Sequence, residues 1–293
     1  MPPARAMFRG IGSRCGGLCP TGGNVIFIGI QRHGVRLASR HGAILHDLLP
    51  LVLVCNGPLL MEWMALSAEE WVAVRLSLKV ASVATLVSLP LVIAVAMALG
   101  RYQFWGHALL NGLVLLPLIL PPVVTGYLLL LLFGRRGAIG GFLADHLGIV
   151  FSFRWTGAAL ACGVMGFPLL VRALRLSIEA VDPRLEEAAG TLGANRGWVF
   201  LTVTLPLIVP GILAGTILCF AKAMGEFGAT ITFVSNIPGE TQTLPSAIYT
   251  FTQVPGGDVG ALRLTLVSIA ISILALLVSE ILARRAQQRL DIQ

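Results

Sequence analysis

Long apolar runs alternate with short polar segments along most of this chain. A helix needs about 20 apolar residues to cross the hydrocarbon core of a bilayer. Runs that approach or exceed this length cover residues 72–99, 108–133, 155–171, 203–234 and 262–282. The pattern predicts an all-α fold, a polytopic transmembrane helical bundle with five core spans.

The N-terminal 63 residues show no sustained hydrophobic period. Residues 44–60 are apolar, but they include His46, Asp47 and two prolines, so this stretch is marginal as a span. It is either a sixth, N-terminal span or an extension that precedes a later start at Met61 or Met64. The more regular sequence from Met64 onward favours the second interpretation. We therefore treat 1–63 as a poorly defined extension and 64–293 as the transmembrane domain.

Composition and charge placement support a membrane protein. Only 12% of the residues are charged, against about 25% in a soluble domain. The net charge of +7 does not indicate nucleic-acid binding, because the arginines gather near the N-terminus and beside the apolar runs. The charge bias places the C-terminus and residues 172–196 in the cytoplasm and residues 235–260 outside. Arg135, Arg136 and Arg154 then fall outside, so the bias is moderate.

The sequence contains no recognisable catalytic or cofactor motif. The phosphate-binding pattern G-x4-G-K-[ST] is absent, since neither Lys79 nor Lys222 follows a glycine. The patterns H-E-x-x-H and G-x-S-x-G are absent too. The cysteines show neither a metal-site spacing nor an even count for disulfide pairing. We therefore expect no cofactor, no metal and no enzymatic activity of the chain's own.

The polar segment 182–206, between the third and fourth apolar runs, carries clear helix signals. Asp182 can cap a helix whose first residue is a proline. Gly193 can adopt the left-handed conformation that ends this helix. Asn195 can then cap a second short helix, which should end near Pro206 because proline interrupts helical hydrogen bonding.

The first of these short helices has a narrow apolar stripe. Leu185, Ala188, Ala189 and Leu192 fall at positions i, i+3, i+4 and i+7, on one face. The small residues in the middle allow another surface to approach the backbone closely. The stripe suits either a helix that lies on lipid headgroups or a helix that docks on another protein.

The spacing in this segment resembles the EAA signature of ABC importer permeases, EAA-x3-G-x9-I-x-L-P. Here Glu187-Ala188-Ala189 is followed by Gly193 and then by Val203-Thr204-Leu205-Pro206, so that only Val203 departs from the pattern, conservatively. The resemblance implies a type I ABC importer permease fold and a cytoplasmic loop whose short helix docks in a groove of a separate ATPase subunit. The implied coupling residues are Leu185, Glu187, Ala188, Ala189, Leu192, Gly193 and Pro206.

Further stretches are similar to the molybdate-type permeases of this family, among them residues 75–79, 120–127, 221–230 and 239–245. The resemblance implies a multi-pass protein of the cytoplasmic (inner) membrane that imports molybdate or tungstate. It also implies partners of three kinds: two cytoplasmic ATPase subunits, an extracytoplasmic oxyanion-binding protein and a second copy of the chain. The alternative is a sulfate or thiosulfate importer permease, because tetrahedral dianions place similar demands on a pathway. A membrane-embedded enzyme or assembly factor is a third hypothesis, which the EAA spacing disfavours.

Charged residues inside the fourth run are candidates for the pathway or its gate. Lys222 and Glu226 are four residues apart and therefore share one helix face. Charges at membrane depth face protein or water. The pair is either a structural ion pair that fixes helix packing or a polar lining of the pathway. Thr230 is a further candidate, because it lies in the stretch 221–230 that is similar to the molybdate-type permeases.

Two other features of the apolar runs complete the candidate set. Lys79, near the outer end of the first run, either extends to the lipid headgroups or forms a basic rim that attracts an anion. Pro121 and Pro122 remove backbone donors from the second run and should kink it. Such a kink is either a matter of shape alone or the hinge at the pore.

Overall fold

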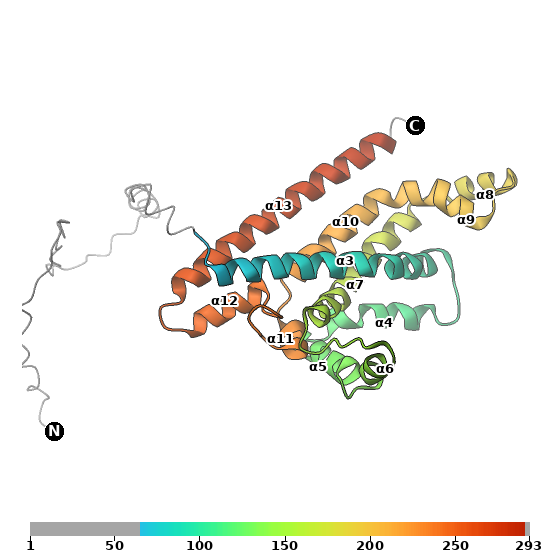
Figure 1. Ribbon diagram of the computed structural model, residues 1–293. Coiled ribbons are helices and arrows are strands. Elements are labelled where there is room, and N and C mark those ends of the chain that lie inside the picture. Colours follow the sequence, from blue (N-terminus) through green and yellow to red (C-terminus); the bar gives the residue numbers. More distant parts are fainter. Residues whose placement is uncertain (1–64, 291–293) are drawn as a thin grey trace, which may run out of the picture. The chain divides into compact units, whose positions relative to one another are not determined.

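The computed structural model describes residues 65–290, and every regular element within that range is a helix (Figure 1). The predicted extension, residues 1–63, lies outside the described residues. The helices, labelled as in Figure 1, are α3 (Ala68–Arg101), α4 (His107–Ile119), α5 (Pro122–Phe133), α6 (Ala138–Leu147), α7 (Trp155–Glu179), α8 (Pro183–Thr191), α9 (Arg196–Val199), the π-helical η1 (Phe200–Thr204), α10 (Leu205–Met224), α11 (Gly228–Val234), α12 (Leu244–Gln253) and α13 (Asp258–Leu290).

The apolar runs predicted from the sequence are present as helices. Within residues 65–290, four helices are long and apolar enough to cross a membrane: α3, α7, the continuous helix Arg196–Met224, and α13. The pair α4 and α5 provides a fifth candidate if the two are counted as one broken span. The all-α prediction is confirmed for the described part of the chain.

The kink predicted in the second run, 108–133, is present and sharp. The interruption falls at the predicted proline pair, and α4 and α5 are bent by 115° where they meet. Leu120 and Pro121 both have extended ψ angles, 143° and 135°. A residue that precedes proline avoids the α conformation. Here Leu120 precedes Pro121, and Pro121 precedes Pro122. The chain therefore turns sharply before Pro122 begins α5.

The fourth predicted run, 203–234, is divided as well. α10 ends at Met224, and α11 begins at Gly228. Gly225 stands at the end of α10, where its poor helix propensity makes an interruption less costly. The run also begins earlier than predicted, because helical structure extends back to Arg196.

α7 is the most enclosed of the spanning helices. In its most apolar window 67% of the residues are buried, against 11% for α13, because α3 and α10 pack along α7. A Cβ added at Gly215 of α10 would lie 3.0 Å from Leu170 and 3.1 Å from Ala173 of α7. The absence of a side chain at Gly215 therefore lets α10 approach α7 closely. The exposed leucines and isoleucines of α13 suit a lipid environment.

The two interrupted segments meet, because α11 packs against α5. A Cβ added at Gly126 of α5 would lie 2.9 Å from the Cα atom of Ala229. A Cβ added at Gly228 would lie 2.8 Å from the Cβ atom of Pro122. Both glycines are needed for this close approach, which brings the first turns of the two short helices together.

The residues of the predicted outer loop, 235–260, are ordered by a helix that the sequence pattern did not predict. This helix, α12, packs against α3 and α13. Its first amide, that of Leu244, donates a hydrogen bond of 2.6 Å to the buried Ser77 hydroxyl of α3. α12 and the starts of α3 and α13 lie at one end of the bundle, and α8, α9 and the end of α3 lie at the other (Figure 1).

Candidate functional site

The segment 182–206 forms a corner at one end of the bundle, and its predicted caps are confirmed. The Asp182 carboxylate accepts a hydrogen bond of 2.9 Å from the Arg184 amide at the start of α8. The Asn195 side chain accepts one of 2.8 Å from the Trp198 amide at the start of α9. These local signals fix where both short helices begin.

The turn between α8 and α9 depends on Gly193. Its φ of +88° lies in the left-handed region, which glycine adopts without the steric penalty of a Cβ atom. The Gly193 amide donates to the Gly190 carbonyl at 3.0 Å, and the Ala194 amide donates to the Ala189 carbonyl at 3.3 Å. These bonds satisfy carbonyls at the end of α8, so the predicted helix stop is confirmed.

The predicted helix end near Pro206 is wrong. The helix that starts at Arg196 runs on to Met224, and Pro206 lies in the first turn of α10. A proline ring inside a regular α-helix clashes with the carbonyl four residues earlier. The π-helical segment η1 immediately precedes α10, and its wider turn gives the ring room without ending the helix.

The apolar stripe of α8 faces away from the bundle. Leu192 is 89% exposed, Leu185 and Ala188 are also exposed, and Ala189 is partly buried. None of the residues of α8 is buried. Glu187 is exposed as well, so the candidate coupling residues on α8 form an accessible surface of leucine, alanine and one carboxylate.

Glu186, which the sequence reasoning did not single out, faces the bundle instead. Its Oε1 atom accepts a hydrogen bond of 2.9 Å from Nη2 of Arg101, at the end of α3. The same atom accepts one of 2.6 Å from the Thr204 hydroxyl in η1. Adjacent helical residues point about 100° apart, so Glu186 can reach Arg101 and Thr204 while Glu187 stays exposed. We call the side chains of Arg101, Glu186 and Thr204 the Glu186 junction.

A cavity of about 460 Å³ adjoins this junction, between α8, η1 and the end of α3. It is lined by both glutamates of α8, by Arg101 and by Arg196. The cavity leaves α8 with few apolar contacts to the bundle.

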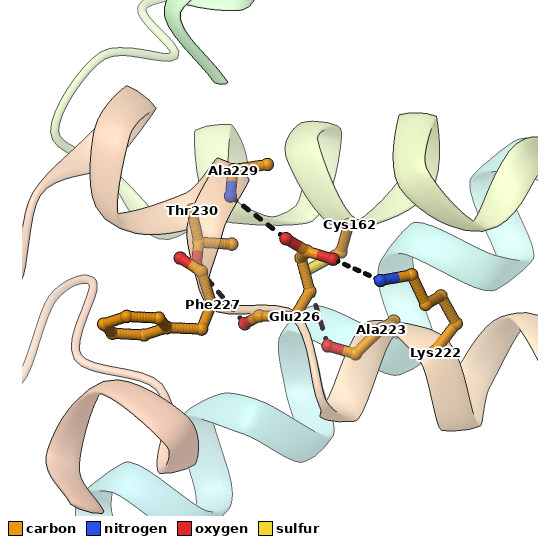
Figure 2. A network of polar contacts seen from close by, with 7 residues as sticks. All are labelled: Cys162, Lys222, Ala223, Glu226, Phe227, Ala229 and Thr230. Atoms are coloured by element: carbon orange, nitrogen blue, oxygen red, sulfur yellow. Dashed lines mark hydrogen bonds and ion pairs between the residues drawn. The ribbon is translucent and has the colours of Figure 1, made fainter. Parts of the chain in front are cut away.

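The predicted ion pair in the fourth run is present and spans the interruption between α10 and α11 (Figure 2). The Lys222 Nζ atom lies 2.7 Å from Oε2 of Glu226, and the Ala229 amide donates to Oε1 of Glu226 at 3.0 Å. Glu226 is 2% exposed, whereas Lys222 is partly exposed. The carboxylate therefore both balances a cation and satisfies a free amide of α11.

Thr230 lies beside this pair but makes different contacts. Its hydroxyl donates to the Phe227 carbonyl at 2.9 Å, and its side chain is buried (Figure 2). On the neighbouring α7, the buried Cys162 thiol donates to the Ala223 carbonyl at 3.5 Å. Around the ion pair, buried polar side chains thus add hydrogen bonds to the Ala223 and Phe227 carbonyls, which also accept from the Glu226 and Ile231 amides.

Lys79 lies beside Trp155 at the start of α7, and the proline pair lies beside the start of α11. The Lys79 Nζ atom lies 3.7 Å from the centre of the Trp155 ring at the start of α7, a cation–π geometry that holds the cation beside an aromatic side chain. Pro121 and Pro122 are exposed, and Pro122 contacts the start of α11. The structure therefore brings the proline pair close to the Lys222–Glu226 segment.

A second buried carboxylate, Glu70, was also missed. It is 1% exposed and pairs with Arg263 of α13 at 2.9 Å. Glu70 also completes a capping box with Ser67, whose amide donates to Glu70 Oε2 at 2.7 Å. The S-x-x-E spacing could have revealed the cap, but no local signal reveals the partner 193 residues away.

Comparison with known proteins identifies the chain's relatives. The family model for a binding-protein-dependent transport system inner membrane component matches residues 90–288. The molybdenum transport system permease protein ModB of Escherichia coli K12 is 60% identical over 77% of this chain and 99% of its own length. ModB of Haemophilus influenzae is 55% identical over 74% of this chain and 95% of its own.

Solved structures agree on the fold. A bacterial ABC transporter that imports the acidic polysaccharide alginate matches with a TM-score of 0.60 at 16% identity, over 83% of this chain and 95% of that one. The MetNI methionine ABC transporter matches with a TM-score of 0.56 at 14% identity, over 79% of this chain and 99% of that one. The family match, which covers more than half of the sequence, shows that this chain belongs to the inner membrane components of binding-protein-dependent transport systems.

Proposed function

We propose that this chain is the transmembrane permease subunit of an ATP-driven importer for molybdate, with tungstate as a second oxyanion cargo. The observation that carries the proposal is the 60% identity to ModB of Escherichia coli along 99% of that protein's length. The exposed stripe of α8 supports it, since a permease without its own nucleotide-binding motif needs a surface on which a partner ATPase can act.

The partners follow from the family and from the exposed surfaces. An ABC importer permease works with ATPase subunits and with an extracytoplasmic binding protein. We propose two ATPase subunits, one for each of two copies of this chain, and an oxyanion-binding protein that docks on the face formed by α12 and its neighbouring loops. In this arrangement the C-terminus and α8 are cytoplasmic, in agreement with the charge bias of the loops.

The coupling step is assigned to the exposed face of α8. Leu185, Ala188, Ala189 and Leu192 insert into a groove of the ATPase subunit, and Glu187 pairs with a cation on its rim. Gly193 sets the turn that orients this helix, and Pro206 marks the point where the corner enters α10. When ATP closes the ATPase dimer, α8 moves with it and the paired permeases tilt from inward-open to outward-open.

The pathway is assigned to the paired interruptions at membrane depth. Pro121 and Pro122 lie where α5 begins, next to the interruption between α10 and α11, which Lys222, Glu226 and Thr230 surround. Lys222 is partly exposed and could meet an anion while Glu226 balances its charge. Lys79 serves as a basic residue at the outer entrance, held beside Trp155.

A reconstituted complex tests the proposed function. The chain is co-expressed with its candidate ATPase, placed in liposomes and supplied with the binding protein, and ATP-dependent uptake and ATP hydrolysis are measured together. We expect the binding protein loaded with molybdate to stimulate both. Uptake that is independent of ATP, or of the ATPase subunit, would refute the proposal.

A sulfate importer permease is the second candidate, because sulfate permease 2 of Chlamydomonas reinhardtii is 48% identical over 51% of this chain and 40% of its own length. The same liposomes discriminate between the two when molybdate, tungstate and sulfate are supplied in turn. Stimulation by sulfate alone would favour this second candidate.

A further inference from the structure

We infer that Glu186 is a positioning residue that holds α8 against the membrane bundle, so that force applied to the exposed face of α8 reaches α3 and α10 together. The inference rests on the proposed function, because it concerns how that function is coupled to ATP. The observation that carries it is a single carboxylate oxygen that accepts hydrogen bonds from two elements distant in sequence.

The contacts of Glu186 join three parts of the chain. Arg101, at the end of α3, is 85 residues away and lies 2.9 Å from Oε1. Thr204, in the last turn before α10, is 18 residues away and lies 2.6 Å from the same atom. Arg101 also donates to the Val181 carbonyl, just before α8, at 3.3 Å. α3, α8 and the base of α10 therefore meet at one carboxylate.

The burial of these groups makes the contacts strong for a site at the edge of the bundle. The side chain of Arg101 is 15% exposed and that of Glu186 is 26% exposed, while Thr204 is buried. Hydrogen bonds to charged groups are roughly twice as strong as neutral ones. Removing the carboxylate would leave the guanidinium and a buried hydroxyl without this acceptor.

Apolar packing cannot replace the junction. No residue of α8 is buried, and a cavity of about 460 Å³ lies between α8, η1 and the end of α3. A segment with few buried apolar contacts opens at a low free-energy cost. The orientation of α8 therefore depends on polar contacts, and within residues 65–290 the Glu186 junction is the one that reaches both α3 and η1.

Loss of the junction should uncouple the complex without removing the docking face. Leu185, Glu187 and Leu192 stay on the exposed side of α8 in a Glu186 variant, so the ATPase still binds. The bound helix then swings relative to α3 and α10 when the ATPase closes. ATP is still hydrolysed, but fewer ions are transported for each ATP.

The test compares Glu186→Ala with Glu179→Ala in the reconstituted complex. Glu179 pairs with Arg175 at 2.7 Å, but both residues lie on α7, so the control removes an ion pair that joins no separate elements. We expect Glu186→Ala to co-purify with the ATPase and to lower molybdate uptake per ATP hydrolysed by at least about tenfold, because both hydrogen bonds to the carboxylate are lost and one charged hydrogen bond alone is worth about that factor. Glu179→Ala should match wild type in both measurements.

A distance measurement gives a second readout that does not depend on the cargo. Spin labels are placed at Arg184 on α8 and at Trp105, after α3, both of which are exposed. The distribution of distances between them should broaden in Glu186→Ala and stay narrow in Glu179→Ala. Glu186→Gln keeps an acceptor oxygen and should therefore recover part of the lost coupling. If Glu186→Ala does not accumulate in the membrane, Glu186→Gln replaces it in both measurements.

The outcomes distinguish failure of the proposed transport function from failure of the positioning role of Glu186. If wild type takes up no molybdate but the label distances still broaden in Glu186→Ala, the proposed function fails and the positioning role stands. If wild type transports and both Glu186 variants keep its uptake per ATP and its narrow distances, the inference is overturned. Loss of ATPase binding in Glu186→Ala would also overturn it, because Glu186 would then belong to the docking face.

Discussion

Two carboxylates, Glu226 between α10 and α11 and Glu186 on α8, each accept hydrogen bonds from two partners, but the partners differ in kind. Glu226 accepts from Lys222 and from the Ala229 amide, all within one turn of the α10–α11 interruption, and it is almost fully buried. Glu186 accepts from Arg101 and Thr204, which are far away in sequence, and it remains partly exposed.

Whether the partners are local or belong to other helices decides whether a carboxylate fixes a local shape or links the motion of separate helices. The partners of Glu226 belong to its own segment, so its contacts fix a local shape that the bundle then encloses. The partners of Glu186 belong to other helices, so its contacts transmit displacement between elements. We therefore expect changes at the buried site to reduce the stability of the folded permease, and changes at the corner to reduce coupling while the protein stays folded.

The largest effect is expected for Lys222→Ala, which leaves the Glu226 carboxylate buried without its cation. Breaking a buried ion pair from one side costs about 3–5 kcal/mol, so the permease should accumulate poorly and unfold at a lower temperature in detergent. Thermal unfolding of the purified protein measures this loss. Glu179→Ala, which breaks an exposed pair within α7, is the control and should change little. Equal stability of Lys222→Ala and wild type would show that the pair is incidental.

The next effect is expected for Gly193→Pro, at the corner. Proline fixes φ near −65°, whereas Gly193 has φ +88° and an amide that donates to Gly190. The turn that orients α8 is therefore lost, and ATP-driven uptake should be abolished although the protein still inserts in the membrane.

Gly193→Asn is the matched control, because asparagine tolerates the left-handed region better than other residues with a side chain. It should keep most of the uptake. Normal uptake in Gly193→Pro would mean that the geometry of the corner does not matter for coupling.

The same uptake experiment with Glu187→Arg tests the exposed face of α8. We expect Glu187→Arg to lose uptake too, while the permease still inserts in the membrane.

How much of this could be predicted from sequence depends on the range of each signal. The caps at Asp182 and Asn195 and the left-handed Gly193 were predicted, because each involves residues within one or two turns. The apolar runs were predicted because their composition alone specifies the environment. The partners of Glu186 and Glu70 could not be predicted, since they lie 85 and 193 residues away and only the fold brings them close.

The prolines show a second limit. Pro206 was predicted to end a helix, yet a π-helical segment accommodates it. The Pro121–Pro122 pair was predicted to kink a span, and the chain does bend there, but the size of the bend, 115°, was not predicted. A proline removes one donor and constrains its neighbour, but the packing of the surrounding helices decides whether the chain continues or turns.

A smaller effect than that of Lys222→Ala is expected when the same ion pair is broken from the other side by Glu226→Gln. Glutamine keeps an oxygen that can accept from the Ala229 amide, and the partly exposed Lys222 can reach water. The stability lost should be about 1.5–3 kcal/mol, the cost of one charged hydrogen bond. Thermal unfolding of the two variants side by side measures the difference. If Glu226→Gln proved as damaging as Lys222→Ala, the unequal burial of the two partners would not govern the site.

The smallest effect is expected for Thr204→Val, which removes one of the two hydrogen bonds to Glu186 and keeps the side-chain shape. Arg101 still holds the carboxylate, so the loss should be about 1 kcal/mol, seen as a reduction of a few-fold in uptake per ATP. Thr202→Val is the matched control, because the exposed Thr202 hydroxyl donates only within its own helix, to the Trp198 carbonyl. Equal coupling in the two variants would mean that Arg101 alone positions Glu186, and that α3 rather than η1 receives the displacement of α8.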